Sequence, residues 1–255
     1  MAPEPRPPFS NYGWRARLGV IVPPTNTVNE AEWGLMAPEG VTVHSARMPL
    51  HADTGGAEAE RTLFDDLERA SGDLAQAGVD VIAYGCTAGS MVAPMTRLTD
   101  FMTGATGVPA VATAPAIVQA LGALGVRRVA LATPYGEALN ADERRFLAAN
   151  GVEVVAAQGL GYGDGGPDEY VNIARVPVAE VFEFVRAADT EAAEAVVVSC
   201  TDFATSPIIA RLEAALAKPM VTSNQATLWA ALRAAGLDLA VPGFGRLLDH
   251  GGTRT

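Results

Sequence analysis

The chain has two cysteines, and each stands in the same local pattern. Cys86 follows the apolar run 80–84, Cys200 follows the apolar run 195–198, and a threonine comes directly after each cysteine. Short β-branched runs bounded by small residues are typical of buried strands. Both thiols are therefore expected near the carboxyl end of a strand, where parallel sheets hold their ligands. We predict that the two thiols face each other across one pocket.

Such a pair of thiols supports a specific chemistry. One thiolate attacks a carbon or removes a proton from one face of a substrate, and the other thiol delivers a proton from the opposite face. We expect each cysteine at a helix N-terminus, a position that lowers the pKa of a thiol. Thr87 and Thr201 are candidates to hold a carboxylate or enediolate oxygen. The alternative is that both cysteines are ordinary core residues.

Three further residues are candidates for binding a substrate. Asn26 follows the predicted strand 18–22, and Tyr135 lies in the loop that closes the predicted strand 128–132. Asn26 is either a carboxylate ligand or an ordinary turn or cap residue. Tyr135 is either a hydroxyl donor to the substrate or a packed loop residue. Asn172 is a weaker candidate that serves equally well as a cap or turn residue.

Several other chemistries are disfavoured by the sequence. The histidines His44, His51 and His250 have no metal-ligand spacing with the cysteines, so we expect no metal. Neither a phosphate-binding Walker loop nor a dinucleotide fingerprint is present. Residues 85–89 have the outline of a nucleophile elbow, but their central residue is threonine and no histidine follows in the required order.

Composition excludes some classes of partner. The chain has 255 residues and a net charge of −11, without a basic run, so nucleic acid and anionic membranes are poor partners. No apolar run approaches the ~20 residues of a membrane span. The proline-rich residues 1–9 lack the apolar core of a signal peptide. We expect a cytoplasmic protein, in which the two thiols stay reduced.

Strand-like and helix-like segments alternate along the chain, which predicts parallel sheets with crossover helices. The clearest helix, 57–77, has leucines at helical spacing and ends before Gly78. The two halves repeat one order of elements, and residues 217–223 match residues 106–113. We therefore predict an α/β fold made of two copies of one α/β unit, with the active site in the cleft between them.

The predicted boundaries follow from this repeat. Residues 1–13 are expected to be a disordered leader. The first α/β domain is predicted to comprise residues 14–113 plus 223–255, and the second to comprise residues 114–222. We also expect further copies of the same chain in a homo-oligomer.

Four segments, together with Trp229, carry a family resemblance. They are VPPTNT at 22–27, AYGCTAGS at 83–90, VSCT at 198–201 and PMVTSNQA at 219–226. In these segments the chain resembles the maleate cis-trans isomerase family, which belongs with the arylmalonate decarboxylases to the aspartate/glutamate racemase superfamily. The resemblance covers nearly the whole chain after about Trp14.

The resemblance implies an α/β fold of two pseudo-symmetric Rossmann-like domains related by a pseudo-twofold axis, without a cofactor. It implies a small dicarboxylate as the substrate partner. It also implies that Cys86 attacks the double bond of maleate to form a succinyl thioether, with charge held as an enediolate. The C2–C3 bond then rotates, and elimination gives fumarate, with Cys200 as the proton donor. Asn26, Tyr135 and Asn172 match the substrate-binding positions of the family.

Two alternatives stay open. The Cys-Thr pair at 86–87 is closer to the pattern of racemases, which leaves an amino-acid or hydantoin racemase that uses Cys86 and Cys200 as opposed bases. The other alternative is a non-catalytic protein that binds a small anion or senses redox state. Arylmalonate decarboxylases have glycine at the earlier cysteine position, so Cys86 argues against that activity.

Overall fold

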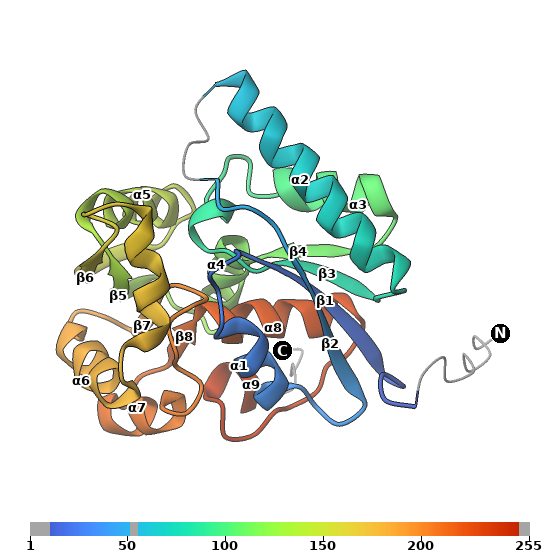
Figure 1. Cartoon of the computed structure of the whole chain (residues 1–255). Coiled ribbons are helices and arrows are strands. Elements are labelled where there is room, and N and C mark those ends of the chain that lie inside the picture. The colour runs from blue at the N-terminus through green and yellow to red at the C-terminus, as the bar shows by residue number, and fades with distance from the viewer. Residues whose placement is uncertain (1–10, 52–55, 250–255) are drawn as a thin grey trace.

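The computed structural model describes residues 11–51 and 56–249, which contain two four-stranded sheets (Figure 1). Every pair of neighbouring strands is parallel. The first sheet has the order β2-β1-β3-β4, from β1 Ala16–Val22, β2 Val41–Arg47, β3 Val81–Tyr84 and β4 Ala110–Ala112. The second has the order β6-β5-β7-β8, from β5 Arg128–Tyr135, β6 Glu153–Tyr162, β7 Ala195–Val198 and β8 Met220–Thr222. The predicted α/β fold is confirmed.

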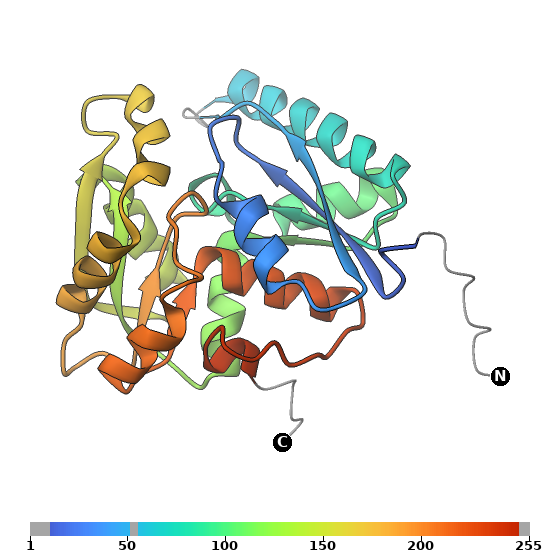
Figure 2. The same cartoon turned by 60° about the horizontal axis from the view of Figure 1, so that its bottom comes forward.

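Helices cover both faces of each sheet, as Figures 1 and 2 show. On the first sheet, α2 Ala57–Gln76 and α3 Arg97–Thr106 pack on one face, and α1 Asn29–Met36 and α8 Ser223–Ala234 pack on the other. On the second, α6 Val178–Ala188 and α7 Ile209–Leu216 cover one face, and α4 Thr113–Ala123 and α5 Glu137–Ala149 cover the other. The remaining elements are α9 Arg246–Asp249 and the 3-10 helices η1 Ala88–Ser90 and η2 Pro167–Arg175.

The helix α2 shows why these segments fold as they do. Leu63, Leu67, Ala70 and Leu74 are buried, and their spacing of three or four residues places them on one face of the helix. That face packs on the first sheet with α3 beside it. The predicted helix 57–77 is therefore confirmed.

The helix α8 joins the two sheets. It follows β8 of the second sheet, yet its Leu228, Ala231 and Leu232 pack against strands of the first sheet. Its Thr227 hydroxyl donates to Thr113 Oγ1 of α4 over 3.1 Å. The chain thus returns to the first sheet near residue 223. The domain boundaries themselves stay a prediction, and residues 1–10 of the predicted leader lie outside the described residues.

The strand β5 is longer than the sequence predicted. It runs through Pro134 to Tyr135, where a closing loop was expected. The pairing of β5 with β6 shifts register between Thr133 and Tyr135, so the missing N–H of Pro134 is tolerated there. The partner strand β6 approaches β5 closely at Gly159. A Cβ at Gly159 would overlap the Tyr135 carbonyl oxygen, so only glycine allows this close pairing.

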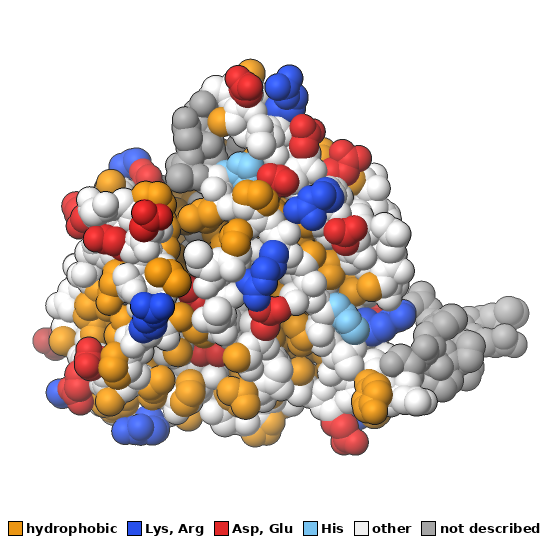
Figure 3. Space-filling view, viewed as in Figure 1, with side chains coloured by type: hydrophobic (Ala, Val, Ile, Leu, Met, Phe, Trp, Pro, Cys, Tyr) orange, Lys and Arg blue, Asp and Glu red, His pale blue; other side chains and the backbone are white. Residues whose placement is uncertain are grey.

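Within the described part of the chain, no helix is long and apolar enough to cross a membrane. On the face seen in Figure 3, Lys and Arg side chains are interspersed with Asp and Glu. The carboxyl ends of β1, β3, β5 and β7 point to one region between the sheets, and the loops that leave them line a single cavity.

Candidate active site

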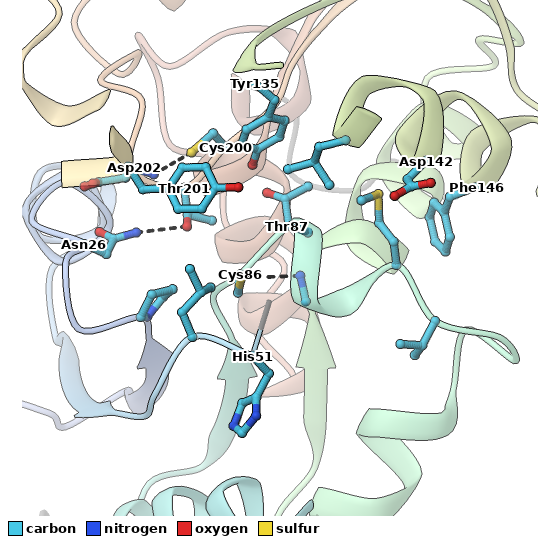
Figure 4. A pocket seen from close by; sticks show the side chains of 18 of the residues that line it. Asn26, His51, Cys86, Thr87, Tyr135, Asp142, Phe146, Cys200, Thr201 and Asp202 are labelled. Atoms are coloured by element: carbon cyan, nitrogen blue, oxygen red, sulfur yellow. Dashed lines mark hydrogen bonds between the residues drawn. The ribbon is translucent and has the colours of Figure 1, made fainter. Parts of the chain in front are cut away.

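Both cysteines line one cavity of about 640 Å³ (Figure 4). Cys86 enters it from the turn after β3, and Cys200 enters it from the turn after β7. Thr87, Thr201, Asn26 and Tyr135 line the same cavity. The structure therefore brings together six of the seven residues that the sequence singled out.

The turn that carries Cys86 is compact. Its sulfur accepts the N–H of Gly89 over 3.4 Å, and its carbonyl oxygen accepts the Ser90 hydroxyl over 2.6 Å. A Cβ at Gly85 would lie 3.0 Å from the Ile21 carbonyl oxygen, so glycine lets the two strand ends approach closely. The Cys86 side chain is buried apart from its face toward the cavity.

The turn that carries Cys200 holds a less common backbone conformation. Cys200 has φ +94°, in the left-handed region that residues with a Cβ rarely adopt. Such a conformation costs about 1–3 kcal/mol and persists only where surrounding contacts hold it. Here the Cys200 N–H donates to Ser223 Oγ over 3.0 Å, and the sulfur accepts the Asp202 N–H over 3.4 Å. These contacts thus offset the cost of the backbone conformation that sets the direction of the Cys200 side chain.

The prediction that both cysteines lie at helix N-termini is wrong. Cys86 precedes only the three-residue 3-10 helix η1, and the next helix after Cys200 is α7, which begins at Ile209. Burial raises the pKa of both thiols, that of Cys200 to about 12. One backbone N–H at each sulfur does not compensate for the loss of water around a thiolate.

The two thiols differ in the charges around them. The Tyr135 hydroxyl and the Asp202 N–H lower the pKa of Cys200 against the effect of burial, and the Asp202 carboxylate raises it by a smaller amount. At Cys86 burial is opposed by the Gly89 N–H and the Tyr84 hydroxyl, and no carboxylate contributes. Cys86 therefore ionises more readily, because no neighbouring carboxylate opposes its thiolate. At Cys200 the Asp202 carboxylate favours the protonated thiol.

Hydrogen bonds tie the two Cys-Thr turns together. Asn26 Nδ2 donates to Thr201 Oγ1 over 2.9 Å, and Thr201 Oγ1 donates to the Gly85 carbonyl oxygen over 3.0 Å. Thr87 Oγ1 lies 2.9 Å from Ser223 Oγ, which also accepts the Cys200 N–H. Ser223 therefore connects the turn of one cysteine to the turn of the other.

These bonds decide what remains for a ligand. Asn26 Oδ1 accepts the N–H groups of Val28 and Asn29, so this residue caps the start of α1. The second N–H of Asn26 Nδ2 is left to donate into the cavity. The Thr201 hydroxyl hydrogen is already used on Gly85, whereas the Thr87 hydroxyl can donate to a ligand when Ser223 donates to it.

Asn172 is the candidate that the structure does not bring to the cavity. It lies in η2, and its Oδ1 accepts a guanidinium N–H of Arg175 over 3.1 Å. Its neighbours Tyr170 and Ile173 line the cavity instead. The 3-10 turn places residues 170 and 173 on the inner side and leaves residue 172 on the outer side.

Comparison with known proteins decides the family. A model of the family described as arylmalonate decarboxylase matches residues 18–248. A maleate isomerase of Pseudomonas putida is 31% identical over 250 residues, which cover 91% of this chain and 97% of the relative. The chain belongs to the maleate isomerase and arylmalonate decarboxylase family. It is therefore an enzyme of this family by descent and by fold.

Two further members bear on the chemistry. The arylmalonate decarboxylase of Bordetella bronchiseptica is 30% identical over 239 residues, covering 91% of this chain and 96% of that protein. A solved structure of the Nocardia farcinica maleate cis-trans isomerase superposes with a TM-score of 0.80 at 26% identity, covering 92% and 98% of the two chains. That structure is a cysteine-to-serine mutant with a covalently bound succinylcysteine intermediate.

Several residues at or beside the cavity of this protein were not predicted from the sequence. Asp202 lines the cavity two residues after Cys200, and a carboxylate so close to a suspected reactive thiol was a readable signal. Ser223 was readable from the internal repeat, because it starts α8 as Thr113 starts α4. Tyr170 gave no signal, since only the fold of η2 turns it toward the cavity.

The rest of the cavity wall is mainly apolar. Leu139 and Phe146 of α5 face Met91 and Pro94 of the loop after η1. The ion pair between Asp142 and Arg145 lies along the same wall. Among the described residues, no group of three or more His, Cys, Asp or Glu side chains is placed to hold a metal ion.

Arg47 and His51 both have partners within the protein. The Arg47 guanidinium donates to the carbonyl oxygen of Asn26 over 2.8 Å and pairs with Glu30, so it fixes the loop after β1. His51 lines the cavity and lies 3.0 Å from the Asp66 carboxylate.

Proposed function

We propose that this protein is a cofactor-independent isomerase that converts maleate to fumarate, with Cys86 as nucleophile and Cys200 as acid and base. One observation carries the proposal: two thiols line one cavity, and only Cys200 has a carboxylate beside it. The resemblance to maleate isomerases over nine-tenths of the chain supports the substrate.

The first step is the attack of Cys86. Its thiol loses the proton to solvent in the cavity, and the thiolate forms a carbon–sulfur bond to C2 of maleate. The electrons of the double bond move onto the C3 carboxylate, which becomes an enediolate. The Thr87 hydroxyl and the remaining N–H of Asn26 are the donors available to hold the growing oxyanion charge.

The second step is rotation and elimination. The Cys200 thiol gives its proton to C3, which leaves a succinyl thioether on Cys86 and a thiolate at Cys200. The C2–C3 bond is now single and rotates. The Cys200 thiolate then removes the proton from C3, the double bond re-forms, and the Cys86 thiolate leaves. The substrate and product are isomers, so no other reactant is consumed.

A second candidate, a racemase of an amino acid or hydantoin, is favoured by the likeness of the two sulfur sites. Each sulfur accepts one backbone N–H over 3.4 Å, and one tyrosine hydroxyl lowers the pKa of each thiol. Two opposed bases that remove and return one proton need this balance. The charge of Asp202 at one site only favours the isomerase instead.

The test is proton NMR of the purified protein with maleate in D2O, beside Cys86→Ala and Cys200→Ala. We expect fumarate with the parent protein and none with Cys86→Ala. Maleate that stays unchanged with the parent protein would overturn the isomerase. Deuterium exchange at the α-carbon of candidate amino acids and hydantoins then tests the racemase, and reversible thiol oxidation without any turnover would indicate a sensor.

A further inference from the structure

Tyr84 is a buried tyrosine two residues before Cys86, and it does not belong to the cavity wall among the described residues. It is the last residue of β3, and its carbonyl oxygen accepts the Thr113 hydroxyl over 3.0 Å. The side chains of Tyr84 and Cys86 pack in the same buried cluster. The Tyr84 hydroxyl partly opposes the rise in the pKa of Cys86 that burial causes.

Gly89 shows that the fold keeps room for this hydroxyl. A Cβ at residue 89 would overlap Tyr84 Oη and would lie 3.1 Å from the Cζ atom of the same ring. Gly89 does not have a positive φ, so its backbone conformation does not require glycine. The Gly89 N–H also donates to the Cys86 sulfur. Because residue 89 has no side chain, its N–H and the Tyr84 hydroxyl can both approach the Cys86 sulfur.

Cys200 has a matching arrangement from different parts of the chain. Its sulfur accepts the Asp202 N–H, and the Tyr135 hydroxyl partly opposes the rise in its pKa. Tyr135 comes from the neighbouring strand β5 and lines the cavity, whereas Tyr84 comes from the strand that precedes Cys86 and is not among the residues that line the cavity. Tyr135 is thus open to a substrate, and Tyr84 is not.

We propose that Tyr84 is a positioning residue that donates its hydroxyl hydrogen to the Cys86 sulfur and stabilises the thiolate that attacks and leaves. The proposal rests on Cys86 being the nucleophile of the proposed function, but the hydrogen bond is testable without any substrate. Burial raises the pKa of Tyr84 well above its ordinary value, so the hydroxyl stays protonated as a donor. A hydrogen bond to a charged group stabilises that charge more than one to a neutral group.

The experiment measures the alkylation rate of each cysteine separately. The parent protein, Tyr84→Phe and Tyr135→Phe are treated with iodoacetamide from pH 7 to pH 10, and the modified peptides are quantified by mass spectrometry. For Tyr84→Phe we expect the rate at Cys86 near pH 8 to fall about tenfold, with its pH profile moved to higher pH, because the thiolate loses a charge-assisted hydrogen bond. The rate at Cys200 should stay within about twofold of the parent. Tyr135→Phe is the matched control and should give the reverse pattern.

A second variant keeps the test decisive if Tyr84→Phe does not fold. Gly89→Ala leaves the tyrosine in the chain but displaces its hydroxyl from the sulfur, and we expect the same selective slowing at Cys86. Equal slowing of both cysteines, or a Cys86 rate within twofold of the parent in both variants, would overturn the proposal. No substrate is used, so a protein that fails to convert maleate would still report on the role of Tyr84.

Discussion

The two halves of the molecule hold their sulfur atoms alike but surround them with different charges. Each sulfur accepts one N–H from the turn that follows it, and one tyrosine hydroxyl lowers the pKa of each thiol. Two residues after the cysteine, however, the first half has Ala88 and the second has Asp202. The repeated frame thus supplies two thiols, and one substituted residue gives them unequal acidity. A duplicated fold becomes an asymmetric site through such local differences.

A second pair of positions shows the same divergence in the helices. Glu32 follows Asn29 by three residues in α1, and Glu143 follows Asn140 by three residues in α5. Both glutamates are buried. Glu32 hydrogen bonds to the loop after Cys200 in the other half, whereas one carboxylate oxygen of Glu143 has no hydrogen-bond partner among the described residues.

The contacts of the two glutamates explain this difference. The Glu32 carboxylate accepts the N–H groups of Thr205 and Ser206 over 2.5 and 2.6 Å and the Asn224 amide over 2.7 Å. It therefore anchors the loop after Cys200. In contrast, Oε2 of Glu143 has no hydrogen-bond partner among the described residues, and burial raises the pKa of this carboxyl to about 7.

The largest effect is expected from exchanging the two thiols for alanine. Under the proposed mechanism either substitution lowers turnover of maleate by about 10⁴-fold or more. The two variants differ in what accumulates. Cys200→Ala should hold a maleate adduct on Cys86, because water protonates the enediolate and no thiolate is left to remove that proton, whereas Cys86→Ala should hold none. Intact-protein mass spectrometry separates these outcomes, and an adduct on Cys200 in Cys86→Ala would reverse the assigned roles.

The second effect is on stability and has opposite signs in the two halves. We expect Glu32→Gln to lower the free energy of unfolding by about 2–4 kcal/mol, because the new amide N–H₂ faces the Asn224 amide donor. We expect Glu143→Gln to raise the free energy of unfolding at pH 8. Chemical denaturation of the parent and both variants at pH 5 and pH 8 measures this.

The sign for Glu143 follows from proton binding. Its pKa rises from 4.5 in the unfolded chain to about 7 in the fold, so the folded state holds the proton more tightly. The contribution to stability is fully present below pH 4.5 and is lost as the pH rises through 7, a change of about 3 kcal/mol. Glutamine does not titrate, so the advantage of the variant over the parent should grow from pH 5 to pH 8. An advantage that does not change with pH would contradict this account.

The smallest effect tests the charge beside Cys200. Asp202→Asn keeps the Oδ1 acceptor that holds the Thr27 N–H over 2.8 Å but removes the negative charge. The pKa of Cys200 should fall, and its alkylation by iodoacetamide near pH 9 should become several-fold faster, with little change at Cys86. The control is Asp142→Asn, since this carboxylate lines the same cavity but is paired with Arg145. Equal rates in both variants would remove Asp202 from the comparison.

Much of the frame was readable from the sequence because it depends on neighbours in the chain. The runs before Cys86 and Cys200 are strands, and the leucines of α2 give its periodicity. Parallel strands end at one edge of their sheet, which places each Cys-Thr pair at a ligand-binding edge. The two pairs belong to different sheets, however, and only the packing of the two sheets brings them to one cavity. The length of β5 was missed because its pairing with β6, not the residues around Pro134, decides where the strand stops.

By itself the sequence determined the alternation of strands and helices, the internal repeat and the two thiols, since each is a local pattern. Only the tertiary structure decided the state of those thiols. The bond from Asn26 to Thr201 spans 175 residues, and the contact of Thr87 with Ser223 spans 136. The local pattern predicted that both thiols lie at helix N-termini and have lowered pKa values. In the fold both thiols are buried, and burial raises their pKa values. Desolvation depends on every atom packed around a group, and most of those atoms come from distant parts of the chain.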